Sequence, residues 1–530
     1  MFDKMTPNQR LLVAVLISII FFVAYTAIFP PEEPKQNLQK DTQEVVEKTQ
    51  SVSVEKVSGH TISESEKINA SGSNDIVVIK NDKFILKIDS LGRISSKELL
   101  EEKFRDSEDL HAQVIPQNGT KPLFVRFLDK EINENSLKTP YVASIANAEL
   151  SAEKPVEVTL TQNLPQLTVT KQLKFYADGH YDVKISTSKD VRYYVYIGDR
   201  PQVTKQLMAV AGSMIYTNED VAHITEDGEA EGRKVFSGVE LASAFDQYTA
   251  TLMYGFKADT NVIVERGFDN NPVVYFEAEN NGEFHGYIGP KEYKVLKAIN
   301  PVLVNAIEYG WFTFAAKPLF ALLSWLYGIF GNWGWAIIAL TAIIRAVLYP
   351  LTHKGMSSMQ KIKELAPQLK EIKEKYGKDP QRMNAATMEM YKKHGANPLG
   401  GCLPMLLQIP VFFAIYRVLL NAVELQGASW ILWIDDLSRM DPYYILPILM
   451  GASMFYQQHL TPNNFTDPMQ EKLFKYLPVI FTFFFITFPS GLVLYWFVNN
   501  LFSIAQQFVV NQQFKNAKDA KAAVEKKSGK

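Results

Sequence analysis

The chain has 530 residues and a formal net charge of −2. This length can hold two or more domains, and the near-neutral balance provides no basic field, so no direct nucleic-acid specificity is predicted. The single cysteine, Cys402, excludes an intrachain disulfide. The sequence contains no phosphate-binding loop, H-E-x-x-H or paired C-x-x-C pattern, and its histidines lack metal spacing, so no metal, cofactor or catalytic residue is predicted.

Residues 1–30 are predicted to be an N-terminal transmembrane anchor. Residues 11–29 are apolar, and Lys4 and Arg10 precede them. A cleaved signal peptide is the alternative, but the apolar run is long for one and no clean small-x-small site precedes Pro30-Pro31. A retained anchor leaves Lys4 and Arg10 in the cytoplasm. Residues 31–75 are polar with almost no aromatic side chains, which predicts a flexible linker.

Residues 76–299 are predicted to form a large all-β domain. Short runs of alternating polarity, such as KFILKID and QLTVTKQLKFY, recur between turn signals. Many short, evenly spaced strands indicate a β-sandwich or barrel, which lies outside the cytoplasm if the anchor enters with its N-terminus inside. A sandwich of this size could bind sugar or peptide, but no motif indicates either. Surface or turn positions are expected for its histidines, which have no carboxylate or serine partners in sequence: His111, His180, His223 and His285.

Residues 333–350, WGWAIIALTAIIRAVLYP, are apolar and long enough to span a membrane, yet they contain Arg345. At 1.5 Å per residue, Arg345 lies roughly 12 Å from His353, where polar sequence resumes. A charge at that depth costs about 2.5–3.5 kcal/mol and is expected to face protein or a water-filled cavity. Arg345 is therefore a candidate functional residue.

Residues 300–331 fit either another span or an amphipathic helix lying in the membrane interface. The segment 354–394 that follows the Arg345 helix holds ten Lys and Arg residues against five Asp and Glu residues. A span at 300–331 would place this basic segment outside the cytoplasm. The positive-inside rule therefore favours an interfacial helix at 300–331 and a second span at 332–352.

Residues 397–512 are predicted to contain spans three to six, at about 399–423, 443–460, 476–488 and 492–510. Five spans after the β-domain return the C-terminus to the cytoplasm, in agreement with the basic tail at 513–530. The predicted fold class is therefore a polytopic α-helical membrane protein with six spans, five of them forming one core, and a large extracytoplasmic all-β domain.

Residues 353–396 are predicted to form a basic cytoplasmic helical hairpin. Apolar side chains recur every three or four residues, Pro367 is expected to bend the first arm, and Gly377 to Pro380 form the turn. A solvated hairpin accounts for much of the charge, but positive-inside bias alone does not require so long a pair of helices. Docking of a ribosome or targeting factor is the other interpretation, through Lys370, Lys373, Lys375, Lys378 and Arg382.

The predicted spans carry several polar side chains. In the sixth span, a helical stripe is formed by Trp496, Asn499, Asn500, Ser503, Gln506 and Gln507. Gln408 lies in the third span, and Thr341 precedes Arg345 by one turn on the same face. Interhelical hydrogen bonding is the default role of each such residue. No Asp or Glu lies well inside any span, so the combination with Arg345 favours a hydrated interior surface.

Several segments closely resemble the YidC branch of the YidC/Oxa/Alb membrane protein insertases. They include TAIIRAVLYPLT (341–352), NPLGGCLPMLLQIPVFFAIY (397–416), DPYYILPILMG (441–451), TDPMQ (466–470) and FPSGLVLYW (488–496). The likeness covers most of residues 300–515. The N-terminal anchor and β-domain resemble the Gram-negative form, in which the periplasmic domain is a β-supersandwich similar to sugar mutarotases, without an assigned enzyme activity.

This resemblance implies an insertase core whose hydrophilic groove opens to the cytoplasm and laterally to lipid. Arg345 and Thr341 match the family's groove arginine and threonine. Tyr495-Trp496 stands where the family commonly has a substrate-contacting tyrosine pair, so one hydroxyl is lost. The implied location is the bacterial inner membrane, with both termini in the cytoplasm and the large domain in the periplasm. The implied partners are nascent membrane proteins, the ribosome, the signal recognition particle pathway, the Sec translocon and the lipid bilayer.

The function predicted from the sequence is a membrane protein insertase and chaperone that is not an enzyme. In this hypothesis, Arg345 attracts acidic flanks of a nascent segment, which then leaves sideways into lipid. The groove contacts are expected from Arg345, Thr341, Gln408, Tyr495, Trp496, Asn499 and Ser503. The alternatives are a small-solute transporter, which the lack of an inverted repeat disfavours, and a membrane-tethered sugar-binding periplasmic protein.

Overall fold

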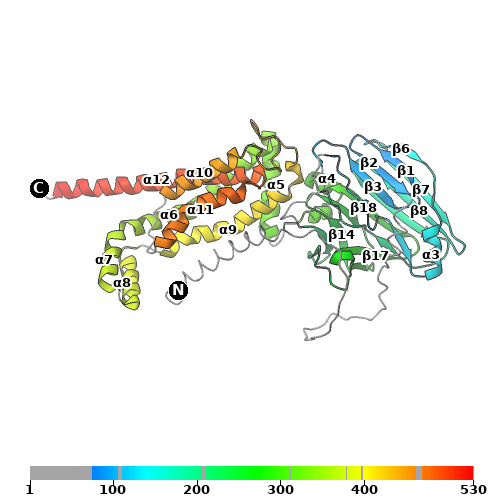
Figure 1. Ribbon diagram of the computed structural model, residues 1–530, viewed down its shortest axis with the longest axis horizontal. Helices are drawn as coiled ribbons and strands as arrows, with labels where there is room; N and C mark the ends of the chain where they lie inside the picture. The colour runs from blue at the N-terminus through cyan, green and yellow to red at the C-terminus, as the bar shows by residue number, and fades with distance from the viewer. Residues whose placement is uncertain are drawn as a thin grey trace. The chain divides into compact units, whose positions relative to one another are not determined.

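The computed structural model describes residues 74–105, 110–203, 210–309, 312–377, 379–395, 398–460 and 468–528. The predicted anchor at 1–30 and nearly all of the predicted linker at 31–75 lie outside these described residues. Within them, a β-domain is followed by a set of long helices (Figure 1).

The β-domain contains three sheets, and every strand pairing in them is antiparallel except that of β1 with β6. The largest has the order β12 (Ala222–Glu226), β11 (Gly212–Thr217), β14 (Val239–Phe245), β15 (Thr249–Tyr254), β18 (Gly282–Pro290), β9 (His180–Thr187), β8 (Thr168–Phe175), β7 (Val156–Asn163) and β5 (Val142–Ala143). The second has the order β13 (Arg233–Phe236), β16 (Val262–Arg266), β17 (Pro272–Ala278), β10 (Tyr193–Tyr196) and β4 (Val125–Phe127). The third has the order β3 (Ile94–Leu99), β2 (Phe84–Asp89), β1 (Asp75–Lys80) and β6 (Asn147–Glu149).

One hydrophobic core joins all three sheets, which confirms the predicted sandwich. It includes Ile79 from β1, Leu173 from β8 and Phe276 from β17. Strands β7, β8 and β9 alternate between buried and more exposed residues, as expected for strands with one solvated face. The helix α3 (Lys130–Lys138), capped by Asp129, and the short 3-10 helix η2 (Phe268–Asn270) complete this part of the domain.

A second core continues from the other face of the large sheet into the helices. Every residue of β11 and β15 is buried, because one face of these strands packs in the sandwich and the other against helices. The second core includes Leu252 of β15, Leu296 of α4 (Tyr293–Ile299), Leu303 of η3 (Pro301–Ala306) and Val418 of α9 (Pro398–Asn421). The sheet is therefore covered by helices at its β11–β15 end.

The remaining helices are α5 (Thr313–Phe330), α6 (Trp333–Glu364), α7 (Ala366–Tyr376), α8 (Pro380–Lys393), α10 (Ile445–Leu460), α11 (Pro468–Phe485) and α12 (Ser490–Ser528), with the short η5 (Val423–Leu425) after α9. Helix α6 packs against α5, α9 and α12, and α10 packs against α11 and α12 (Figure 1). The second span and the beginning of the hairpin's first arm, as far as Glu364, form one continuous helix, α6, and the sixth span continues as α12 into the basic tail.

Three of the described helical segments are long and apolar enough to cross a membrane, namely Thr313–Phe330, Trp333–Glu364 and Ser490–Ala520. Gln408–Asn421 and Phe474–Phe485 are shorter apolar helical segments. Length and composition thus permit α5 to cross as well as to lie in the interface, and the count of six spans remains a prediction.

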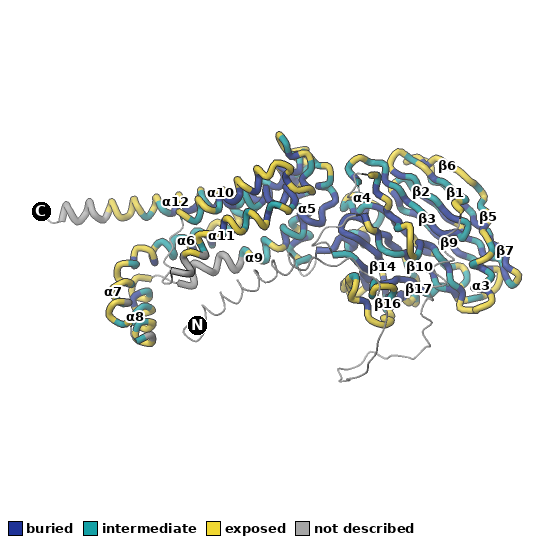
Figure 2. Tube along the Cα trace, in the orientation of Figure 1, coloured by how far each residue is buried: buried dark blue, intermediate teal, exposed yellow. Residues whose placement is uncertain are grey.

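The hairpin has its own small core. Ile362, Leu365 and Met390 are buried against one another, and most other residues of α7 and α8 are exposed or intermediate (Figure 2). The predicted bend at Pro367 coincides with the break between α6 and α7. Proline is tolerated there because it occupies the first turn of α7, where its missing N–H leaves no helical hydrogen bond unmade.

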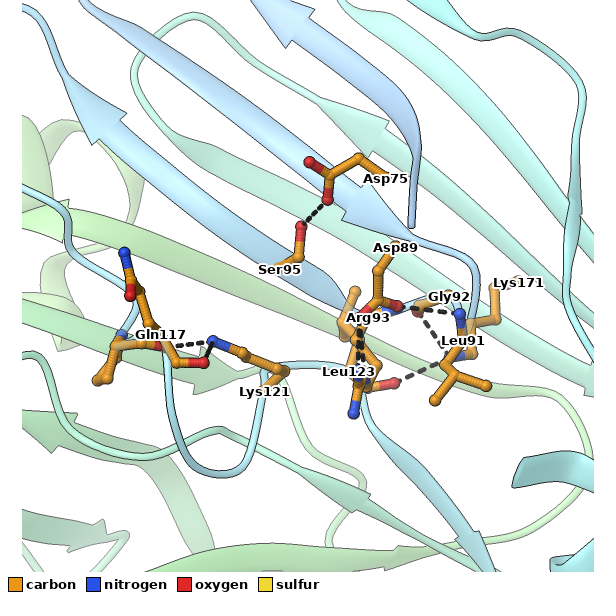
Figure 3. Close-up of polar contacts among 11 residues, drawn as sticks. Asp75, Asp89, Leu91, Gly92, Arg93, Ser95, Gln117, Lys121, Leu123 and Lys171 are labelled. Atoms are coloured by element: carbon orange, nitrogen blue, oxygen red, sulfur yellow. Dashed lines mark hydrogen bonds and ion pairs between the residues drawn. The ribbon is translucent and has the colours of Figure 1, made fainter. Parts of the chain in front are cut away.

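A buried polar cluster lies between the third sheet and β8 (Figure 3). Lys171 is fully buried, and its Nζ donates to the carbonyl oxygens of Gly92 and Leu123 at 2.8 and 2.9 Å. Asp89 and Arg93 form a buried ion pair of 2.7 Å. Leu123 has a positive φ of 65°, which is an unfavourable backbone conformation for a leucine. The hydrogen bond from Lys171 to its carbonyl therefore helps to hold this turn.

Lys171→Met should alter how the stability of the β-domain depends on pH. Burial lowers the pKa of Lys171 from 10.5 to about 7. Between these pH values the unfolded chain binds more protons than the folded chain, so this lysine makes the free energy of unfolding rise with pH. Lys171→Met should therefore flatten the rise between pH 7 and pH 10 and cost about 1–3 kcal/mol through its two unpaired carbonyls.

The measurement is urea denaturation of the full chain in detergent, with pulse proteolysis of the β-domain at each pH. Lys174→Met, an exposed neighbour on β8, is the control and should keep the wild-type slope. An unchanged slope in Lys171→Met would contradict the role assigned to its burial.

Candidate functional site

The polar surface predicted in the spans is formed by α6, α9 and α12. The first turn of α6 is fixed by Asn332, whose side chain accepts a hydrogen bond from the Trp335 N–H at 3.2 Å. The same side chain donates to the Ser429 carbonyl at 3.0 Å, so the start of α6 is tied to the loop before α10. Arg345 follows three turns later, on the face that packs against α12.

Arg345 is held by two residues of α12. Its Nε donates to Asn499 Oδ1 at 2.7 Å, and its Nη2 donates to the Asn499 carbonyl at 3.0 Å and to Ser503 Oγ at 2.5 Å. Asn499 and Ser503 are one turn apart, so one face of α12 supplies all three acceptors. The prediction that Arg345 and the stripe of the sixth span meet is therefore confirmed for Asn499 and Ser503.

The charge of Arg345 is not neutralised by these contacts. Among the described residues, no carboxylate lies within ion-pair distance of its guanidinium, and both of its protein partners are neutral. Its third nitrogen, Nη1, donates to no side chain or carbonyl in the described part of the chain. Since a guanidinium has five N–H donors, Arg345 keeps hydrogen-bonding capacity for a further acceptor.

Other polar contacts extend this surface along the same helices. Gln408 of α9 approaches Asn499 Oδ1 at 3.5 Å, which places α9 beside the arginine. Two turns further along α6, Thr352 accepts a hydrogen bond of 2.8 Å from Gln506 Nε2. Asn500 instead faces α10 and donates to Ser453 at 3.1 Å. The predicted stripe of α12 therefore contacts two different helices, α6 and α10. Asn500 forms an interhelical hydrogen bond with α10, which is the default role expected for a polar residue in a span.

The other predicted groove residues differ in exposure. Thr341 is only 1% exposed, and its hydroxyl donates to the Ile337 carbonyl of its own helix at 2.7 Å. Tyr495 is only 2% exposed. Trp496 is half-buried among aromatic rings, with centroids of Phe412 and Phe485 each 4.6 Å from its own. Arg345, Gln408, Trp496 and Asn499 are therefore the partly accessible members of the set, whereas Ser503 is buried beneath the arginine.

Three of the five basic residues that are predicted to dock a partner are exposed on the helical hairpin. Lys370, Lys375 and Arg382 are exposed. Arg382 lies 3.4 Å from Asp379, which also caps α8. Lys378 and the side chain of Lys373 lie outside the described residues.

The sequence-based reasoning missed the polar contacts at the other end of α9. Arg417 lies 3.9 Å from Glu308, and Asn421 Nδ2 donates to the Glu308 carbonyl at 2.7 Å. Gln247 of the β-domain donates to the Leu420 carbonyl at 2.7 Å. These partners are more than 100 positions apart in the chain, so no local pattern indicates them.

Comparisons with known proteins identify the same family from several parts of the chain. Residues 325–518 match the family described as 60Kd inner membrane protein, and residues 244–322 match the YidC periplasmic domain. A membrane protein insertase YidC of Wolinella succinogenes is 47% identical, with 98% of each chain covered. One of Campylobacter jejuni is 45% identical, with 97% of each chain covered. A crystal structure of an active YidC insertase with its first transmembrane domain resolved covers 82% of this chain and 94% of its own, with 22% identity and a TM-score of 0.35.

Asn499→Leu should destabilise the packing of α6 on α12. The substitution removes the acceptor of Arg345 Nε and leaves a partly buried donor on a charged group unpaired, at a cost of about 1–3 kcal/mol. Thermal unfolding of the purified chain in detergent measures the effect. Gln512→Leu, on an exposed position of the same helix, is the control. Equal melting temperatures for the two variants would show that the Arg345–Asn499 contact does not stabilise the bundle.

Proposed function

This chain belongs to the YidC family of membrane protein insertases, and on that premise we propose that nascent segments enter the membrane along the polar surface of α6, α9 and α12. Members of this family act on nascent membrane proteins in the lipid bilayer without enzymatic chemistry, so no catalytic residue is required. The observation that carries the proposal is the guanidinium of Arg345, which Asn499 and Ser503 hold and which, among the described residues, has no carboxylate partner and no contact at Nη1.

Arg345 is the residue that receives the polar flank of a substrate. A segment that enters the bilayer must bring its flanking polar residues past the hydrocarbon, where each unsatisfied group costs several kcal/mol. An acidic flank can pair with Arg345 through Nη1, and Gln408 and Asn499 offer further hydrogen bonds beside it. These contacts lower the cost of the crossing while the apolar part of the segment is still outside the lipid.

The apolar part of the substrate supplies the driving force. Its transfer into lipid removes apolar surface from water, which is favourable by about 25 cal/mol per Å². Trp496 and Phe412, which are partly exposed and supported by the buried ring of Phe485, give the polar surface an aromatic wall against which such a segment can pack before it leaves sideways. An acidic flank is also drawn outward by the membrane potential, at about 2.3 kcal/mol per charge per 100 mV.

In the orientation we propose, the β-domain is periplasmic and both termini are cytoplasmic, with α5 lying in the outer interface. Contacts of α5 with the β-domain side support this placement, since Phe320 packs on Tyr293 and Lys317 donates to Asn305 at 2.6 Å. Its other face exposes apolar rings, including Phe314 and Trp325, as an interfacial helix does. Cysteine-labelling from each side of sealed vesicles, at positions 149 and 515, tests the orientation.

The ribosome and the signal recognition particle pathway are the proposed partners of the cytoplasmic hairpin, and the Sec translocon is a further proposed partner of the protein. The exposed basic side chains of α7 and α8 support electrostatic docking to an acidic surface such as ribosomal RNA. Co-sedimentation with ribosomes at several salt concentrations tests it. Charge reversal at Lys370, Lys375 and Arg382 should weaken binding and reduce its salt dependence, and unchanged binding would contradict it.

Arg345→Gln should impair insertion of substrates with acidic flanks by about ten- to hundredfold, since a hydrogen bond to a charged group contributes roughly 1.5–3 kcal/mol. Substrates with neutral flanks should be affected much less. The measurement is protease protection of both substrate types in proteoliposomes. Asn499→Asp is the second variant to test. A carboxylate at that position would neutralise the charge of Arg345 within the protein, so insertion of acidic-flanked substrates should again be impaired more than insertion of neutral-flanked ones.

Arg417→Gln serves as the matched control for this experiment. It removes a second arginine of the helical bundle, but one that lies beside Glu308 rather than beside α12. Equal losses for acidic and neutral flanks in Arg345→Gln would remove the electrostatic role proposed for Arg345 and leave it a packing role.

A further inference from the structure

The end of α9 and the short helix η5 connect the helical bundle to the β-domain. Val423 of η5 packs in the sandwich core, whereas Leu425 packs in the core that the β-domain shares with the helices. Just before η5, the Leu420 carbonyl accepts a hydrogen bond of 2.7 Å from Gln247 of the β-domain. Glu424 lies between the two apolar residues of η5, so its carboxyl group is at the junction between the β-domain and the bundle.

The carboxyl group of Glu424 accepts a hydrogen bond from α4 and forms no ion pair in the described part of the chain. Its Oε1 accepts from the Tyr293 N–H, at the first residue of α4, at 2.8 Å. The ammonium group of Lys103 is near, but it donates to Glu292 at 2.5 Å instead. Gly427 allows this close packing, since it has a φ of 62° and a Cβ there would lie 3.0 Å from Lys103 Cβ. The cation beside Glu424 is therefore already paired with another carboxylate.

The ionisable groups around Glu424 come from three other segments of the chain. They are Lys103 and Glu101 after β3, Glu292 and Tyr293 of α4, and Tyr309 after η3. Lys103 Nζ lies 2.5 Å from Glu292 and 3.9 Å from Glu101. When Glu424 is ionised, it is the third carboxylate beside a single ammonium group. Its negative charge is therefore not compensated at this junction, and like charges in proximity disfavour ionisation.

These surroundings favour the protonated form of Glu424. Burial raises the pKa of Glu424 from 4.5 to about 7, and the charge of Glu292 acts in the same direction, against the hydrogen bond from Tyr293 and the charge of Lys103. When the junction opens, the carboxyl group returns to water and its pKa to 4.5. The closed junction thus binds more protons than the open one between these pH values. Protonation therefore stabilises the closed junction, completely below pH 4.5, and this stabilisation is lost as the pH rises to about 7.

We propose that Glu424 is a pH-sensitive switch that holds the β-domain firmly on the membrane helices when it is protonated and loosens this contact when it is ionised. Glu424 is only partly buried, so protons can reach it from solvent. Its partners on α4 lie within residues 244–322, which match the family's periplasmic domain, so the switch responds to the pH outside the cytoplasm. The switch goes beyond the proposed insertion at Arg345, because none of its residues contacts that arginine.

The test is hydrogen exchange of the full chain in nanodiscs of zwitterionic lipid, followed by mass spectrometry at several pH values from about 5 to 7. The peptides that report on the junction contain Tyr293 and residues 420–428. After correction for the intrinsic exchange rate, the opening equilibrium of the wild type should rise by up to about tenfold per pH unit, because opening releases one proton. Burial lowers the pKa of Lys291, another buried group beside α4, to about 8, so Lys291 stays protonated in this range.

Glu424→Gln should abolish the rise, since the amide keeps an acceptor for the Tyr293 N–H but does not titrate. Its opening equilibrium should equal that of the wild type at about pH 5 throughout the range. Glu283→Gln, which removes a 62% exposed carboxylate of β18, is the matched control and should keep the wild-type rise.

Two further variants separate this proposal from a loss of packing and from the proposed insertion. Glu424→Ala also removes the acceptor, so its junction should open more at every pH but without the wild-type rise. Arg345→Gln should leave the rise unchanged. The proposal is overturned if the wild type opens no more at pH 7 than at pH 5, or if Glu424→Gln and Glu424→Ala keep the wild-type pH dependence.

Discussion

The hydrogen bonds from Arg345 to Asn499 and Ser503 are the constraint on which the helical part of this protein depends. A guanidinium inside a span must be solvated by protein or water, and here neutral groups of one face of α12 do so without cancelling its charge. Since Nε and Nη2 are used, the orientation of the group is fixed, and Nη1, which contacts no acceptor in the described part of the chain, remains for another. A carboxylate at position 499 would stabilise the arginine as well but would remove its attraction for a substrate.

The second hydrophobic core explains how the polar surface is supported from the β-domain. Strands β11, β14 and β15 pack through α4 and η3 onto the membrane helices, so sheet and bundle share one buried interior. Gln247 bonds the last turn of α9, and the same helix brings Gln408 beside Arg345. Residues 244–322, which match the family's periplasmic domain, include Gln247, β15, α4 and η3 from this shared interior.

Much of this arrangement follows from local patterns in the sequence, and the remainder depends on partners that only the fold brings together. Alternating polarity predicted the strands, and helical spacing predicted that Asn499 and Ser503 share a face. The combination of this stripe with an arginine that has no acidic partner in the spans predicted a shared polar surface. The same spacing could not separate Asn500 from that face, because its partner Ser453 belongs to another helix. Thr341 was predicted to line the surface, yet a threonine can bond its own helix, and this one does. His285 was interpreted as an isolated surface residue because its partner, Asp182, is 103 positions away.

Site-specific crosslinking shows whether substrates contact the surface around Arg345. A photoreactive residue replaces Gln408 beside the arginine, or Tyr456, which is 54% exposed on α10, and a stalled nascent chain with an acidic flank is added. Strong crosslinks are expected from position 408, weaker ones when Arg345→Gln is added, and few from position 456. Equal crosslinking from both positions, independent of Arg345, would contradict contact with that surface.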